Sequence, residues 1–270
     1  MKIIKAAGKK VPFRKAHIER SLYDAGATRD FARDVALKVA KKVHSGMSTE
    51  EVLDITLDKI KSNPELYARY DLKRAIMNLG PHGFLFEEYL AQILQEYGYK
   101  TKVGARLKGK VVTQEVDILA TKSKKNHMIE AKYHNARGIY TDTKVAMYTY
   151  ARFLDIKSNH ENKIDRAWLI TNTNFTTGAI KYSSGVNLKV ISWKHPQGES
   201  LRDLINKKGL YPITIFKCIS EPMKEKLFKA KIVLAKDLEK KDLGILSKKT
   251  GLSKETLNNV LGEMHMVCRV

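Results

Sequence analysis

The chain has 270 residues, of which 43% are hydrophobic, and it carries a formal net charge of +21. This apolar fraction excludes an intrinsically disordered chain. A folded chain this positive attracts phosphate polymers through counterion release, so nucleic acid is the expected partner, and a Lys-rich surface that serves solubility is the alternative. The sequence has no apolar run of about 18 residues and no signal-peptide pattern, so we expect a cytoplasmic protein without membrane contact. Cys218 and Cys268 lie far apart and indicate neither a disulfide framework nor a four-ligand zinc site.

Residues 1–79 are predicted to form a mostly helical first domain. Apolar spacing predicts a helix from Phe13, a second over 30–43, a third that starts at Ser48 and ends before Asn63, and a fourth over 66–77. The third begins with a capping-box pattern, Ser48 followed by Glu51. The stretch 79–83 is rich in glycine and proline and marks the first domain boundary.

The segment that follows alternates between helical and strand patterns. The expected elements are a helix over 84–97, strands over 100–107, 110–120 and 126–133, a helix over 141–154, a strand over 166–171, a helix over 176–183 and a strand over 188–193. This order predicts an α/β fold with a mixed central sheet flanked by helices. The chain is helical again from about Ile219. We therefore predict domains at 1–79, 80–217 and 218–270.

Charged residues gather on the hairpin that the second and third strands are predicted to form. A turn centred between Ser123 and Lys124 places Asp117 directly opposite Glu130, about 5 Å away at Cβ, and Lys132 shares the face of Glu130. Opposed carboxylates are destabilising unless a positive charge lies between them, and a divalent cation would supply it. A surface ion-pair cluster is the alternative, but the apolar residues of both strands favour an interior position, where unpaired charges are costly.

An ordered set of motifs over about 80–215 resembles the Mrr-like branch of the PD-(D/E)xK restriction endonucleases. The set comprises Phe86-Glu87, Gly98-Tyr99, Val116-Asp117, Glu130-Ala131-Lys132-Tyr133, and later strand motifs at 169–176 and 190–193. The resemblance implies a Mg²⁺ or Mn²⁺ site of Asp117, Glu130 and Ala131, with Lys132 as catalytic lysine and Glu87 as a helix carboxylate. This sequence departs from the superfamily at Val116, where proline is usual, and from many Mrr relatives at Glu130, where they carry glutamine.

Two further residues are candidates for contact with DNA. His134 continues the face of Glu130 and Lys132, and an exposed strand end is the alternative interpretation. Lys144 shares a face of the next helix with Tyr148, where members of this family place polar residues that line the site. Tyr148 is equally consistent with a core position.

The N-terminal segment from Ile4 to Phe13, the helices after it and Tyr67-Ala-Arg-Tyr70 resemble the ATP-cone, a nucleotide-binding domain. The family's Lys-Arg-x-Gly becomes Lys5-Ala6-Ala7-Gly8, so the arginine is missing. Lys5, Lys9 and Lys10 are the candidates to hold the triphosphate of ATP or dATP. No Gly-rich Lys-Ser/Thr loop occurs, so the resemblance implies an allosteric site. The alternative is a basic helical domain that binds DNA or a partner.

The last segment has helical apolar spacing around a glycine-centred turn. Thr250-Gly251-Leu252-Ser253 resembles the turn of helix-hairpin-helix domains, which present backbone amides to a DNA phosphate. Gly251 and Ser253 are therefore candidate DNA contacts. A plain packing or dimerisation bundle is the alternative.

Taken with these resemblances, the sequence predicts a metal-dependent DNA endonuclease that responds to ATP or dATP. We expect a homodimer, because cutting both strands of DNA usually needs two active sites. A non-enzymatic, nucleotide-responsive DNA-binding regulator is the alternative function. An RNA-binding protein is compatible with the charge, but the sequence has no stacking motif to support it.

Overall fold

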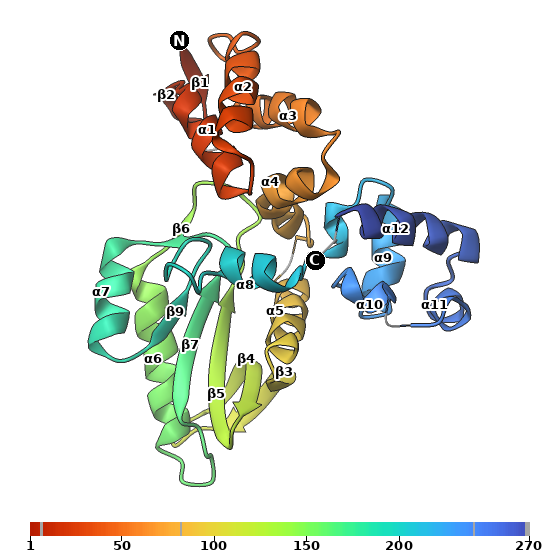
Figure 1. The fold of residues 1–270 in the computed structure, drawn as a ribbon. Helices are drawn as coiled ribbons and strands as arrows, with labels where there is room; N and C mark the ends of the chain where they lie inside the picture. Colours follow the sequence, from red (N-terminus) through yellow and green to blue (C-terminus); the bar gives the residue numbers. More distant parts are fainter. Residues whose placement is uncertain (6–7, 82, 240, 268–270) are drawn as a thin grey trace.

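The computed structural model describes residues 1–5, 8–81, 83–239 and 241–267. Ala6 and Ala7 of the cone-like motif, His82 of the expected boundary and Cys268 lie outside the described residues. The ribbon has an N-terminal part, a central part built around a sheet, and a group of C-terminal helices beside the start of the central part (Figure 1).

The N-terminal part is a short hairpin followed by helices. Its elements are β1 (Lys2–Ile4), β2 (Lys10–Pro12), α1 (Lys15–Asp24), α2 (Arg29–Ala40), α3 (Thr49–Ile60) and α4 (Pro64–Met77). The predicted capping box starts α3, since Ser48 and Glu51 bond each other's backbone amides. Asn63 caps α4 ahead of Pro64, which suits the first helical turn. These helices enclose an apolar core that includes Leu22, Val39 and Ile60.

The central part is a mixed five-stranded sheet in the order β3-β4-β5-β7-β9. The strands are β3 (Lys100–Lys108), β4 (Thr113–Lys122), β5 (Lys125–Lys132), β7 (Arg166–Thr171) and β9 (Lys189–Ile191). Strands β3, β4 and β5 are antiparallel, and β7 and β9 continue the sheet in parallel. Helices connect the parallel strands, as parallel pairing requires. The predicted α/β class with a mixed sheet is confirmed.

Helices cover both faces of this sheet, which makes three layers (Figure 1). Helix α5 (Phe84–Glu96) packs on one face against Ile118, Ile129 and Ile170. Helices α6 (Thr143–Lys157) and α7 (Thr177–Gly185) cover the other face, where Met128 and Leu169 are buried.

The hairpin of β4 and β5 has the predicted register. Ser123 and Lys124 have φ values of 51° and 62°, and Lys122 pairs with Lys125 across the turn. Positive φ at both turn residues is the signature of a type I′ turn, whose twist matches that of the strands. Regular pairing runs from this turn to Ile118 and Ile129, so Asp117 and Glu130 are next along the two strands.

The structure differs from the expected elements at several points. Strand β4 begins at Thr113 rather than at residue 110, because Gly109 donates to the Val112 carbonyl and closes a turn there. Four elements were not predicted: β6 (Tyr140–Thr141), β8 (Asn174–Phe175), α8 (Leu201–Lys208) and the 3-10 helix η1 (Ile213–Ile215). A capping box of Ser200 and Asp203 starts α8, so a local signal for this helix was present in the sequence.

The C-terminal helices are α9 (Glu221–Lys229), α10 (Lys236–Glu239), α11 (Leu243–Thr250) and α12 (Lys254–Val267). Their buried side chains, among them Leu227, Leu238 and Val260, belong to the same apolar cluster as α5 and one face of the sheet. Within the described ranges, no helix is long and apolar enough to cross a membrane.

Candidate active site

Asp117 and Glu130 lie where β4 and β5 stop pairing regularly. The Asp117 Oδ2 accepts a hydrogen bond of 2.7 Å from the backbone N–H of Ala131, so this side chain replaces the next backbone contact of the ladder. On its other side β4 faces Gly104 of β3, whose φ of 64° favours glycine. Burial raises the pKa of Asp117, although the Ala131 bond and Arg152 oppose the rise. A partly buried carboxyl group is thus fixed at the mouth of the hairpin.

Glu130 is 7% exposed and points to α6. Its Oε1 accepts a 3.1 Å hydrogen bond from the Tyr148 hydroxyl, and its Oε2 forms an ion pair with Arg152. Burial raises the pKa of Glu130, the charge of Asp117 raises it further, and Arg152 lowers it. Glu130 therefore combines a costly buried charge with partners that stabilise its ionised form.

Glu87 brings a third carboxyl group to the same place from α5. Burial and the negative charges of Asp117, Glu115 and Glu130 raise its pKa to about 7. The negative charges of Asp117 and Glu130 act on Glu87, so α5 and the hairpin contribute to one anionic region. The sequence-predicted residues Glu87, Asp117 and Glu130 are brought together.

Strand β5 ends at Lys132, and Tyr133 and His134 follow it. Lys132 is the last residue of β5, two positions after Glu130, and its positive charge opposes the rise that burial causes in the pKa of Asp117 and Glu130. The Tyr133 hydroxyl donates to the Met77 carbonyl at the end of α4. The Asn172 side chain accepts a hydrogen bond of 2.9 Å from the backbone N–H of His134 and donates one of 2.7 Å to the backbone carbonyl of His134. Strand β5 is therefore held at this end by α4 and by the loop after β7.

The ring of His134 turns to β6, where its Nε2 lies 3.1 Å from the Thr141 Oγ1. Lys144 lies exposed near the start of α6. The site residue that sequence reasoning missed is Arg152, and Tyr148 was left open between core and site. Residues 144, 148 and 152 recur every four positions, so a polar stripe on one face of α6 was the available signal.

A divalent cation fits the chemistry of this cluster. Within the described part of the chain, no three carboxylate, imidazole or thiol groups are grouped as a protein-only metal cage. Mg²⁺ needs no such cage, because it is usually held by one or two carboxylates and keeps several waters. Asp117 has Oδ1 free of the Ala131 bond, and the Ala131 carbonyl faces the same neighbouring strand as its N–H.

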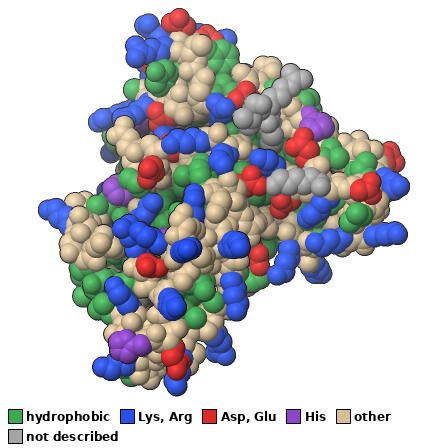
Figure 2. Space-filling view, turned by 60° about the horizontal axis from the view of Figure 1, so that its bottom comes forward, with side chains coloured by type: hydrophobic (Ala, Val, Ile, Leu, Met, Phe, Trp, Pro, Cys, Tyr) green, Lys and Arg blue, Asp and Glu red, His purple; other side chains and the backbone are tan. Residues whose placement is uncertain are grey.

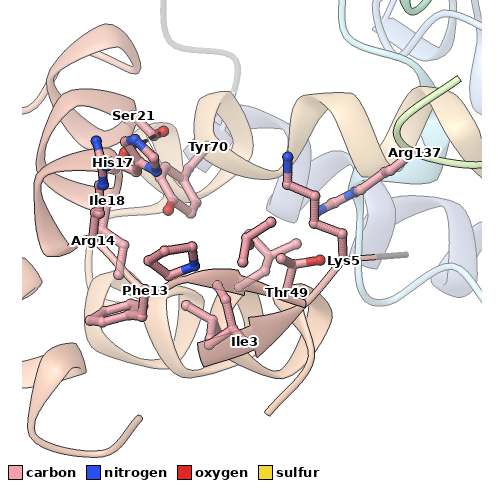
Figure 3. Close-up of a pocket in the computed structure, with 14 residues that line it drawn as sticks. Ile3, Lys5, Phe13, Arg14, His17, Ile18, Ser21, Thr49, Tyr70 and Arg137 are labelled. Atoms are coloured by element: carbon pink, nitrogen blue, oxygen red, sulfur yellow. Dashed lines mark hydrogen bonds between the residues drawn. The ribbon is translucent and has the colours of Figure 1, made fainter. Parts of the chain in front are cut away.

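A separate pocket of about 430 Å³ lies in the N-terminal part, between the β1–β2 hairpin, α1 and α4 (Figure 3). Lys5 lines it together with Arg14, His17 and Tyr70. Lys9 and Lys10 are exposed on the hairpin, outside the described residues that line the pocket. The structure therefore brings one of the three candidate lysines to the cavity.

At the turn between α11 and α12, Gly251 adopts the left-handed conformation, with φ of 67°. Its N–H bonds the Ser247 carbonyl, and the N–H of Leu252 bonds the Thr250 hydroxyl. Ser253 accepts from the N–H of Thr256 and caps α12. Two amides of the turn, those of Gly251 and Leu252, are thus bonded within the protein.

Comparison with known proteins gives three matches to family models. The ATP cone domain matches residues 1–77, the restriction endonuclease model of the Mrr catalytic domain matches 81–204, and the AF1548-like C-terminal model matches 211–268. An uncharacterized protein of Archaeoglobus fulgidus is 39% identical over 166 residues, which cover 59% of this chain and 92% of that protein.

Among solved structures, the protein of unknown function AF1548 is 35% identical, with a TM-score of 0.59 over 67% of this chain and 96% of that one. Can2 from Sulfobacillus thermosulfidooxidans, in complex with cyclic tetra-adenylate, is 13% identical, with a TM-score of 0.35 over 72% of this chain and 54% of that one. Identity, coverage and the ordered family matches agree: the chain belongs to the AF1548-like family and joins an N-terminal ATP-cone to an Mrr-type restriction-endonuclease domain.

Proposed function

We propose that this protein is a metal-dependent DNA endonuclease whose catalytic residues are Asp117, Glu130, Lys132 and Glu87. The observation that carries the proposal is the position of Asp117 and Glu130 at the end of the β4–β5 pairing, where Asp117 is bonded to the Ala131 amide and Glu130 is buried against α6. The raised pKa of both groups and of Glu87 supports it. Such a cluster is costly in a folded protein unless a cation joins it. The match to the Mrr catalytic domain supports the same assignment.

Asp117 and the Ala131 carbonyl would hold the cation, with Mg²⁺ or Mn²⁺ as the metal. When bound, it polarises the scissile phosphate and acidifies a coordinated water. Glu130 contributes through its charge, because Tyr148 and Arg152 already occupy its two oxygens. For Glu130 to bind the cation directly, one of its oxygens must first leave Tyr148 or Arg152.

The protein's own side chains supply the proton and charge chemistry. Lys132 donates hydrogen bonds to a phosphate oxygen and stabilises the negative charge that develops there during attack by water. Glu87, with a pKa of about 7, is suited to accept a proton from the attacking water near neutral pH. His134, two residues beyond the end of β5, and Lys144 on α6 are proposed contacts to the DNA backbone. Lys and Arg side chains are spread widely over the face seen in Figure 2, which suits a polyanionic partner.

The decisive experiment is cleavage of supercoiled plasmid with Mg²⁺ or Mn²⁺, and with EDTA in parallel. We expect nicking or linearisation that EDTA stops and that Lys132→Ala lowers by about 100-fold or more. Lys125→Ala is the matched control, because Lys125 lies exposed at the other end of the same strand. Circular dichroism must show both variants folded. DNA binding without metal-dependent cutting would overturn the endonuclease and favour a nucleotide-responsive DNA-binding regulator.

We further propose that the cone binds ATP or dATP in the 430 Å³ pocket, with Lys5 on its wall. The cone then acts as an effector domain for the nuclease. Cleavage measured with and without each nucleotide tests this role, and identical rates at saturating nucleotide would contradict it. Dimerisation stays a prediction, which sedimentation of the protein with and without DNA will check.

A further inference from the structure

Arg137 belongs to the loop between β5 and β6 of the nuclease domain, yet its side chain lines the pocket of the cone. In Figure 3 it enters beside Lys5, with His17 and Tyr70 on the far wall. No signal in the cone's own sequence predicts this residue, because it lies in the next domain of the chain.

Arg137 also lines a second pocket of about 320 Å³, which lies between the cone and the nuclease domain. The two pockets share Ser21, Leu53, Tyr70 and Arg137 as lining residues, so they adjoin along a common wall. The basic residues of the second pocket are Arg69, Lys73, Arg137, Lys194 and Arg202, and its acidic residue is Asp24. Such a concentration of positive charge in a cavity is suited to an anion.

Carboxylates partly offset these charges: Arg69 pairs with Glu65 at 2.5 Å, and other acidic groups are shared between two cations. The carboxylate paired with Arg137 is Glu50, at 3.6 Å, and Glu50 also bonds Arg74 at 3.0 Å. Asp24 is shared between Arg202 at 3.3 Å and Lys194 at 3.8 Å.

The Lys73 ammonium group lies in the wall of the second pocket, 5.9 Å from the centre of the Trp193 ring. Burial, together with the charges of Arg137 and Lys194, lowers its pKa to about 8. An anion placed between Lys73 and Arg137 would remove this repulsion.

We propose that Arg137 and Lys73 bind the polyphosphate of the nucleotide held in the cone, so that the nuclease domain supplies part of the nucleotide site. This inference rests on the proposed nucleotide binding by the cone and adds to it a residue from the neighbouring domain. Arg137 suits the role because its planar guanidinium bonds phosphate oxygens in pairs. The nucleoside end lies in the less charged pocket of the cone, against Phe13 and His17.

This arrangement links nucleotide binding to the catalytic strand. Arg137 follows Lys132 by five residues in the sequence, and Tyr133 between them is bonded to the end of α4. A nucleotide that binds Arg137 therefore changes the position of the loop between β5 and β6, which begins directly after Lys132. Coupling of this kind requires that the nucleotide bind the two arrangements of the loop with different affinity.

Calorimetric titration of the full chain with ATP, AMP and adenosine, without divalent metal, tests the proposal independently of cleavage. We expect wild type to prefer ATP over adenosine, and Arg137→Ala to bind ATP about tenfold or more weakly, with adenosine little affected. Arg137→Lys should fall between the two, since it keeps the charge and loses the paired geometry. Lys194→Ala should weaken ATP binding by a smaller factor than Arg137→Ala, because the Lys194 side chain is 58% exposed.

Arg33→Ala is the matched control, because Arg33 is exposed on α2 and outside the described lining of either pocket. ATP binding by Arg137→Ala that equals wild type, in a folded protein, would overturn the inference and leave the cone's own site intact. Failure of wild type to bind any of these compounds would instead overturn the nucleotide role of the cone, and this inference with it. The ratio of cleavage rates with and without ATP, compared between wild type and Arg137→Ala, then measures the coupling.

Discussion

Replacing Glu87 by glutamine tests whether the carboxyl cluster stores unfavourable charge before a cation binds. The pKa of Glu87 is raised from 4.5 to about 7, and each pKa unit corresponds to roughly 1.4 kcal/mol. The full shift gives an upper limit of about 3 kcal/mol of destabilisation at high pH. The group is half-exposed, so solvent screening reduces this to about 1–2 kcal/mol. We therefore expect Glu87→Gln to be more stable than wild type in EDTA while it cleaves DNA more slowly.

The pH dependence follows from the direction of the shift. Above pH 7 Glu87 is ionised in both the folded and the unfolded states, and the penalty is fully present. Below pH 4.5 the group is protonated in both states, so the penalty is absent. The stabilising effect of the substitution should therefore be largest near pH 8 and vanish near pH 4.

Urea unfolding followed by circular dichroism, at pH 8 and at pH 4.5, measures this difference. Glu225→Gln, on the exposed side of α9, is the matched control and should leave stability unchanged at both pH values. Equal stability of Glu87→Gln and wild type at pH 8, or a gain of the same size at both pH values, would refute the argument. Added Mg²⁺ should narrow the gap, because it stabilises the wild-type cluster more than the variant.

Three other substitutions give distinct expected outcomes. Arg152→Met leaves Glu130 buried without its ion pair, so we expect a loss of about 1–3 kcal/mol at pH 8 that shrinks as the pH falls and Glu130 becomes protonated, measured by urea unfolding. Lys73→Met should gain about 2–3 kcal/mol at pH 7, because the lowered pKa of Lys73 penalises the folded state, and the gain should fade as pH rises from 8 to 10.5. Tyr133→Phe removes the bond to the Met77 carbonyl, so it should cost about 1 kcal/mol and weaken the ATP effect on cleavage rates. A Tyr133→Phe protein with an unchanged ATP effect would show that α4 does not act through this contact.

The hairpin of β4 and β5 shows what local sequence signals predict well. Two polar residues between alternating strands fixed the turn, and the turn fixed which residues oppose one another as far as Ile118 and Ile129. The strand pattern in the sequence did not predict where the regular pairing of β4 and β5 ends. The bond from the Ala131 amide to Asp117 depends on a side chain that replaces a backbone acceptor, and strand periodicity carries no information about it.

Contacts between distant segments were the other gap. Arg152 reaches Glu130 across 22 residues of sequence, and its position on α6 follows only once that helix is packed on the sheet. Arg137 reaches the cone because of how the two domains meet. Helix α8 could have been predicted from the capping-box residues Ser200 and Asp203. Its apolar pattern alone is too short to indicate a helix. Local sequence patterns therefore predicted the helices, the strands and the carboxylate cluster of the hairpin. Arg152 and Arg137 depend on how distant segments pack.

The two proposed sites have opposite charge, and β5 with its following loop joins them. At one end, Asp117, Glu130 and Glu87 form an anionic cluster whose raised pKa values indicate an unmet need for a cation. In the loop after β5, Arg137 lines a pocket together with Lys73, and we propose that these two cationic side chains bind an anion. Each cluster makes the unliganded fold less stable and gives its ligand a corresponding gain on binding. Because one continuous segment holds residues of both clusters, we expect occupancy of the proposed nucleotide site to change the forces on the strand that carries Lys132. On this proposal, a response to nucleotide would not require a large domain movement, since a small displacement of this segment would alter the geometry beside the proposed metal site.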